Sequence, residues 1–313
     1  MRLVAVVLAA LALAVPAAVA APSGPAVASE WWLQHDGVDA AAVWARTTGA
    51  GVVVADLDSG ADAAHPDLAG ALLPVIDVSG EGGAGDTLGH GTSVAGVIAA
   101  RGVDGLPAGI APGARVLAVK ISGDDRVQQA TLAHALRYVA ERPDVRVINL
   151  SLGGPDEPDV AAAVRYALAQ GKLVVAAAGN MGLDVEQELH TYPCVYAGVL
   201  CVGATTRDGA LAWWSNYSAD LVAVAAPGVG IVSTWPGGGV ETHDGTSLAA
   251  PVVSGIAALL FAAHPEATAA QVRAAIVLGV RPVRALYGYV QAAGEANAPA
   301  ALAALDGLLA SSR

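Results

Sequence analysis

The sequence is poor in positive charge. It has 16 lysines and arginines against 28 aspartates and glutamates, which gives a formal net charge of -12. Nucleic acids and anionic membranes attract basic surfaces, so this excess of acid provides no electrostatic basis for binding either of them. We therefore expect neutral or basic partners and no nucleic acid.

Long hydrophobic runs are missing after the N-terminus. One apolar stretch, residues 3–15, follows a basic residue and precedes a proline and the small residues of an A-x-A site, a pattern typical of a secretory signal peptide. An uncleaved anchor is the alternative, but the stretch is short for a membrane span. We expect residues 1–21 to be a signal peptide cleaved after Ala20 or Ala21, and the product to be extracellular or periplasmic, without a stable membrane anchor.

Cysteine is also scarce, since Cys194 and Cys201 are the only two. They flank a short turn, and an exported chain meets oxidising conditions, so we predict a disulfide between them. The alternative is a pair of reduced cysteines that pack as small hydrophobic residues. Two thiols alone do not make a zinc site.

Apolar residues, by contrast, are abundant. The chain is 55% hydrophobic and 14% charged, and no linker, charge block or internal repeat divides it. This composition excludes disorder and supports a large core, and a single α/β domain of this size is ordinary.

Apolar runs of strand length alternate with stretches of helical periodicity. We expect strands near residues 51–57, 114–121, 145–152, 172–180, 198–205 and 220–228, and helices near 91–100, 128–143, 158–171, 247–265 and 268–280. Because the strands are hydrophobic almost throughout, both faces of their sheet must be covered. The pattern predicts a three-layer α/β/α fold with a mainly parallel central sheet.

Three segments carry side chains that could do chemistry. Asp58 ends a buried strand in "DSG", His90 lies among glycines in "DTLGHGTSVAG", and Ser247 opens a very apolar helix in "HDGTSLAAP". Taken singly, these are an ordinary turn aspartate, helix-start histidine and N-cap serine. Together they supply the hydroxyl nucleophile, the base and the orienting carboxylate that acyl transfer requires.

Two further segments fit the same chemistry. Asn180 ends the strand "VVAAAGN", and its amide could donate to a developing oxyanion together with the Ser247 N–H at a helix N-terminus. The stretch "NLSLGG", residues 149–154, ends another strand in small residues, which suits pairing with an extended peptide.

The order Asp, His, Ser in these three motifs resembles the subtilisin-like serine proteases, the subtilases. "HPDL", "SLGG", "AAAGN" and "VGAT" agree with the same family, and the resemblance runs from about Trp31 to about Ala293. It implies a subtilisin-like fold and a secreted serine endopeptidase that hydrolyses protein or peptide substrates through an acyl-enzyme. The residues that it implies for this site are the triad Asp58, His90 and Ser247, the oxyanion-hole side chain Asn180, and the substrate-binding strand Ser151, Leu152 and Gly153.

The chain also departs from the family. Residues 22–30 form only a short linker with no recognisable prodomain, before a peptidase domain at 31–293 and an Ala-rich helix and tail at 294–313. Subtilases often bind structural calcium, but no stretch here supplies clustered oxygen ligands, so calcium is possible but not placed. We predict no other metal site and no cofactor for the chemistry.

Two other functions remain open at this stage. A peptide ligase or cyclase would use the same acyl-enzyme with an amine acceptor, and a catalytically silent copy of the fold would serve as a binding module. We expect a monomer in each case. Asp56 is a separate question: strand alternation puts it on the same face as Asp58, where a buried carboxyl needs hydrogen-bond donors or a proton.

Overall fold

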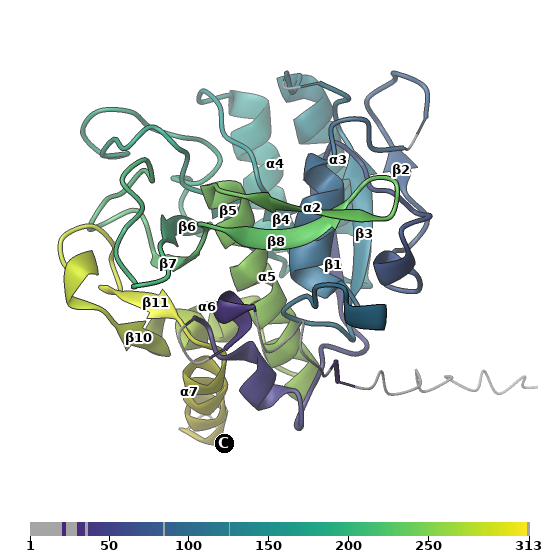
Figure 1. Cartoon of the computed structure of the whole chain (residues 1–313). Coiled ribbons are helices and arrows are strands. Elements are labelled where there is room, and N and C mark those ends of the chain that lie inside the picture. The colour runs from purple at the N-terminus through teal and green to yellow at the C-terminus, as the bar shows by residue number, and fades with distance from the viewer. Residues whose placement is uncertain (1–20, 23–29, 35–36, 84, 125, 312–313) are drawn as a thin grey trace, which may run out of the picture.

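The computed structural model describes residues 21–22, 30–34, 37–83, 85–124 and 126–311. The expected signal peptide and most of the short linker after it lie outside these residues. Figure 1 shows one central sheet with helices on both of its faces. This is the three-layer α/β/α arrangement that the sequence predicts.

Nine strands make the central sheet. Their order across it is β10-β11-β7-β6-β5-β4-β1-β3-β2, and every pair is parallel except β10 with β11. The strands are β1 (Val53–Asp58), β2 (Ile76–Asp77), β3 (Arg115–Lys120), β4 (Val145–Leu150), β5 (Leu173–Ala177), β6 (Leu200–Thr205), β7 (Val224–Pro227), β10 (Val280–Pro282) and β11 (Gly294–Ala296). The six strands predicted from the sequence are all present.

The helices divide between the two faces. Side chains of α3 (Gln129–Glu141) and α4 (Pro158–Ala169) share a hydrophobic core with Val53, Ala55 and Leu57 of β1. On the other face, α2 (His90–Ala99) and α5 (Thr246–Ala263) form a core with Val54, which α6 (Ala269–Leu278) and α7 (Ala298–Ser311) extend. Asp56 and Asp58 alternate with the first set of β1 side chains, so they face α2 and α5.

Helix α5 is the central helix of the molecule. It is long and apolar enough to cross a membrane by composition, but 83% of it is buried inside the fold. A helix that is hydrophobic all round needs partners on every side, and α5 has them in the sheet, α2 and α6. Its first residues therefore stand on a rigid support.

A two-stranded hairpin lies outside the central sheet. It consists of β8 (Ile231–Trp235) and β9 (Gly239–His243), which pair antiparallel. Ser233 and Thr234 donate hydrogen bonds of 2.7 Å from their hydroxyls to the Ser93 and Thr92 carbonyls of α2. The hairpin is thereby fixed against the helix that begins at His90.

Candidate active site

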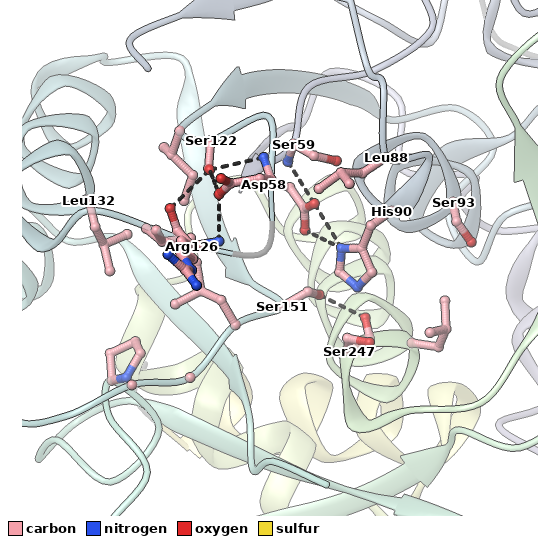
Figure 2. A pocket seen from close by; sticks show the side chains of 18 of the residues that line it. Asp58, Ser59, Leu88, His90, Ser93, Ser122, Arg126, Leu132, Ser151 and Ser247 are labelled. Atoms are coloured by element: carbon pink, nitrogen blue, oxygen red, sulfur yellow. Dashed lines mark hydrogen bonds and ion pairs between the residues drawn. The ribbon is translucent and has the colours of Figure 1, made fainter. Parts of the chain in front are cut away.

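A cleft of about 710 Å³ opens at the carboxyl edge of the sheet (Figure 2). Ligand sites of parallel α/β folds gather at this edge, because the loops after the strands converge there. The cleft brings together Asp58, His90, Ser151 and Ser247, which are up to 189 residues apart in the sequence.

Asp58 and His90 form a close pair. The Nδ1 atom of His90 lies 2.8 Å from Oδ1 and 2.9 Å from Oδ2 of Asp58. A carboxylate can only accept hydrogen bonds, so Nδ1 donates to it and Nε2 is left as the basic nitrogen. The Ser59 N–H also donates to Asp58 Oδ1, at 2.7 Å. Asp58 is therefore held in place while it orients the imidazole.

The charge of Asp58 controls the protonation of His90. The negative carboxylate stabilises the imidazolium and raises the pKa of His90 from 6.5 to about 9, against an opposing effect of burial. The side chain of His90 is 38% exposed, whereas that of Asp58 is 6% exposed. The imidazole thus reaches the cleft while its partner lies beneath it.

His90 begins helix α2 because of the glycine before it. Gly89 has a φ of 84°, a left-handed conformation that glycine adopts without strain. A Cβ at this position would also lie 2.4 Å from the ring of Trp235. The glycine lets the β8–β9 hairpin approach the turn that presents the histidine.

Ser247 lies in the first turn of α5, across the cleft from Asp58. In Figure 2 the His90 ring lies between Asp58 and Ser247, and the edge of the ring opposite Asp58 points toward Ser247. A Cβ on Gly245 would lie 2.8 Å from the Ser247 Oγ, so only glycine leaves this hydroxyl room. Within the described residues no hydrogen bond joins His90 to Ser247, and such bonds are often long before substrate binds.

The Ser247 carbonyl has an unusual partner. In a regular helix it would accept from the N–H of the fourth residue on, which here is Pro251. Proline has no N–H to donate. The Ser151 hydroxyl donates to the Ser247 carbonyl instead, at 2.7 Å.

Asn180 is oriented by its contact with Thr246. Its Oδ1 accepts from the Thr246 N–H at 2.9 Å and from the Thr246 hydroxyl at 2.7 Å. The amide Nδ2 therefore faces the other way, and it and the Ser247 Oγ both lie within 4 Å of the point where a Cβ on Gly245 would stand. The structure brings the predicted donor beside the predicted nucleophile.

Ser151, Leu152 and Gly153 follow β4 and line the cleft. The next residue, Gly154, pairs with Tyr192: its N–H donates to the Tyr192 carbonyl at 2.8 Å, and the Tyr192 N–H donates back at 3.0 Å. The predicted substrate-binding segment is thus held at its far end.

Cys194 and Cys201 are joined in a disulfide, as predicted. Cys201 lies in β6, and Cys194 follows Tyr192 and Pro193, which both line the cleft. The bridge ties one wall of the cleft to the central sheet.

The cleft walls include residues that no sequence motif indicates, among them His243 and Trp235. His243 ends β9, lines the cleft and packs against Trp235 with ring centroids 4.8 Å apart. Its position four residues before Ser247 is the only trace of this in the sequence. Trp235 has no sequence neighbour of chemical interest, and tertiary folding alone brings it to the site.

The described residues contain no group of three or more histidine, cysteine, aspartate or glutamate side chains that could hold a metal ion. The residues predicted for the site supply a carboxylate, an imidazole, hydroxyls and an amide. This set suits proton transfer and nucleophilic attack on a carbonyl.

Comparison with known proteins gives concordant results. Residues 49–294 match the model of the Subtilase family. Subtilisin BL of Lederbergia lenta is 41% identical over 231 residues, which cover 72% of this chain and 82% of the relative. The major intracellular serine protease of Bacillus subtilis strain 168 is 39% identical, over 71% of this chain and 72% of the relative.

A solved structure agrees. The chain in a structure described as proteases from Pseudoalteromonas arctica PAMC 21717 superposes with a TM-score of 0.81 at 29% sequence identity. The match covers 91% of this chain and 99% of that one.

Proposed function

The chain belongs to the subtilase family of serine endopeptidases, and from this premise we propose that Asp58, His90 and Ser247 are its catalytic triad. The observation that carries the proposal is the contact of His90 Nδ1 with both carboxylate oxygens of Asp58, on the side of the ring away from Ser247. The protein then hydrolyses peptide bonds in two steps through an acyl-enzyme.

In the first step the Ser247 Oγ attacks the peptide carbonyl carbon while His90 Nε2 takes the hydroxyl proton. Asp58 holds the Nδ1–H tautomer and stabilises the imidazolium that forms. His90 then gives this proton to the departing amine, the carbon–nitrogen bond breaks, and the acyl group stays on Ser247. In the second step water attacks the ester carbonyl carbon while His90 Nε2 takes its proton. The carbon–oxygen bond to Ser247 then breaks, His90 returns the proton to the Ser247 Oγ, and the carboxylic acid product leaves.

The oxyanion of each tetrahedral intermediate needs donors in place before it forms. We assign this role to the Asn180 Nδ2 and the backbone N–H of Ser247. The orientation of Asn180 by Thr246 supports the assignment, because both acceptor contacts are made by its Oδ1. The Ser247 N–H also lies at the positive end of the α5 dipole.

We assign main-chain recognition of the substrate to Ser151, Leu152 and Gly153. They follow a strand directly and lie in the same cleft as Ser247, so an extended peptide could pair with them as an added strand. The substrates are accordingly proteins or peptides in extended conformation.

Export is proposed from the N-terminal pattern alone. One relative is named as an intracellular protease, so family membership does not decide the location. The proposal expects the mature protein in the medium or the periplasm, with an N-terminus at residue 21 or 22, which N-terminal sequencing of that fraction can measure.

A digestion assay tests the proposed activity. We expect the wild-type protein to degrade casein and Ser247→Ala to lose at least about 10³-fold of that activity, since the nucleophile is the one group that binding and oxyanion donors cannot replace. Circular dichroism of both proteins controls for folding. Equal digestion by the two folded proteins would exclude Ser247 as the nucleophile.

A further inference from the structure

Asp56 is a fully buried acid that the proposed reaction does not use. It lies in the middle of β1, 0% exposed, between its Cα partners Ala118 of β3 and Asn149 of β4. Burial, together with repulsion from Asp58, raises the pKa of Asp56 well above its ordinary value. This side chain does not line the cleft.

Within the described residues, the carboxyl group of Asp56 makes a single hydrogen bond. Its Oδ1 accepts from the Asn149 Nδ2 at 3.0 Å, and its Oδ2 has no partner within the described part of the chain. Burying a carboxyl with one oxygen unsatisfied costs stability. Such a residue in the middle of an otherwise apolar strand calls for a compensating role.

The side-chain amide of Asn149 connects Asp56 to Ser151. Its Nδ2 has two hydrogens, of which one goes to Asp56 and the other to the Ser151 Oγ at 3.0 Å, and its Oδ1 accepts from the Ser254 hydroxyl at 2.8 Å. The Ser254 hydroxyl can donate or accept, so it would satisfy either orientation of the amide. The acceptor oxygen of Asp56 favours the orientation in which Nδ2 faces β1 and Ser151.

Ser151 ends this path at the nucleophile. Because its Oγ accepts from Asn149, its own hydrogen is directed elsewhere, and it goes to the Ser247 carbonyl at 2.7 Å. This is the carbonyl that Pro251 leaves without a helical donor. Three hydrogen bonds therefore run from Asp56 to the backbone of the turn that carries Ser247.

We propose that Asp56 is a positioning residue for Ser247: its buried carboxyl oxygen sets the Asn149 amide so that Ser151 replaces the hydrogen bond that Pro251 removes. The proposal rests on the proposed role of Ser247. Asp56 acts here as a hydrogen-bond acceptor, and its effect passes through Asn149 and Ser151 to the geometry of the nucleophile. Its loss should lower kcat more than it raises KM.

Two variants at Asp56 separate the acceptor from the charge. Asp56→Asn keeps an acceptor oxygen and the shape of the side chain, so it should retain kcat within about threefold, with the acid limb of kcat/KM unmoved. Asp56→Val fills the space but offers no acceptor, and kcat should fall roughly tenfold or more with little change in KM, because small displacements of a nucleophile are costly.

Ser254→Ala is the matched control. It removes a hydrogen bond from the same Asn149 side chain and is equally buried, but it does not lie on the path from Asp56 to Ser247. It should lower the melting temperature and leave kcat near that of the wild type. If Asp56→Val does not fold, Ser151→Ala breaks the path from its other end and should lower kcat by a similar factor.

The proposal is overturned if folded Asp56→Val, or Ser151→Ala, keeps kcat within twofold of the wild type. It is also overturned if Asp56→Asn loses as much kcat as Asp56→Val, or if the Asn variant moves the acid limb, since Asp56 would then act on His90 through charge. The other titratable groups around Asp56, which are Asp58, Asp86 and His90, are unchanged in every variant. A wild-type protein without proteolytic activity contradicts the proposed function instead.

Discussion

His90 is the residue whose protonation should set the working pH. As the general base it must be neutral, and the Asp58 carboxylate raises its pKa from 6.5 to about 9. We predict that kcat/KM on a peptide substrate rises with pH along an acid limb whose midpoint lies above 6.5, toward about 9. A pH profile from about 5 to about 11 measures it directly. A midpoint at or below 6.5 contradicts the account of the Asp58–His90 pair.

The raised pKa of His90 also makes the stability of the fold depend on pH, in the opposite direction to activity. Because the folded state raises the pKa of His90, protonated His90 stabilises the fold. This contribution is fully present below the unfolded pKa of about 6.5 and is lost as the pH rises through about 9. The enzyme should therefore be most active where this pair stabilises it least.

The roles of single residues were only partly readable from the sequence. Asp58 could be distinguished from Asp56 because it comes directly before a turn at the strand end. The hydrogen bonds around Asp56 could not be predicted. Its partner Asn149 is 93 residues away, and the Ser254 hydroxyl that bonds to Asn149 is a further 105 residues along the chain. A buried hydrogen-bond path of this kind depends on strand register and on the docking of α5, which appear only in three dimensions.

The element that matters most for the reaction is the start of α5. Its sequence combines a glycine that leaves room for the Ser247 hydroxyl, a helix N-terminus and Pro251 four residues after the nucleophile. A proline within a helix normally costs stability because a carbonyl loses its donor. Here Ser151 supplies the missing donor, so the substrate strand and the nucleophile's helix are joined by one hydrogen bond.

The disulfide loop is the second element with a measurable effect. The bridge between Cys194 and Cys201 closes a short loop after Tyr192, which pairs with Gly154 at the end of the substrate strand. Replacing both cysteines by serine should lower the free energy of unfolding by about 2–3 kcal/mol, as the chain-entropy relation gives for a loop of this size. KM should rise because one wall of the cleft loses its tether.

The stability part is best measured by urea unfolding with Ser247→Ala in both proteins, which prevents self-digestion. The Cys194→Ser/Cys201→Ser pair in the active protein then gives KM. An unchanged midpoint of unfolding would show that the disulfide does not stabilise the fold by restricting the unfolded chain. An unchanged KM would show that the disulfide does not affect substrate binding in the cleft.

At the scale of the whole molecule, the sequence predicted the three layers of the fold but not the β8–β9 hairpin or the short strands of the central sheet. The six inner strands and the helices on both faces follow from apolar runs and helical periodicity, which reflect burial directly. The β8–β9 hairpin was missed because its residues are mixed polar and apolar and its contacts are hydroxyls donated to α2. Short strands such as β2 and β10 carry no pattern long enough to detect.

In the candidate site, too, only the residues that belong to local sequence motifs could be predicted. Residues that end inner strands or open buried helices, such as Asp58 and Ser247, could be found because their motifs are local. Trp235 and His243 could not, since a hairpin outside the sheet carries them to the cleft. Sequence patterns thus predicted the reacting groups better than the other residues that line the cleft.

The central claim is that Ser247 is an activated nucleophile, and covalent labelling tests it most directly. The folded wild-type protein is incubated with a fluorophosphonate reagent, digested, and mapped by mass spectrometry, with Ser247→Ala and His90→Ala as controls. The account predicts one label, on Ser247, absent in the first control and strongly slowed in the second, because an unactivated serine hydroxyl reacts poorly. A folded wild-type protein that takes no label, or takes it on another serine, contradicts the account.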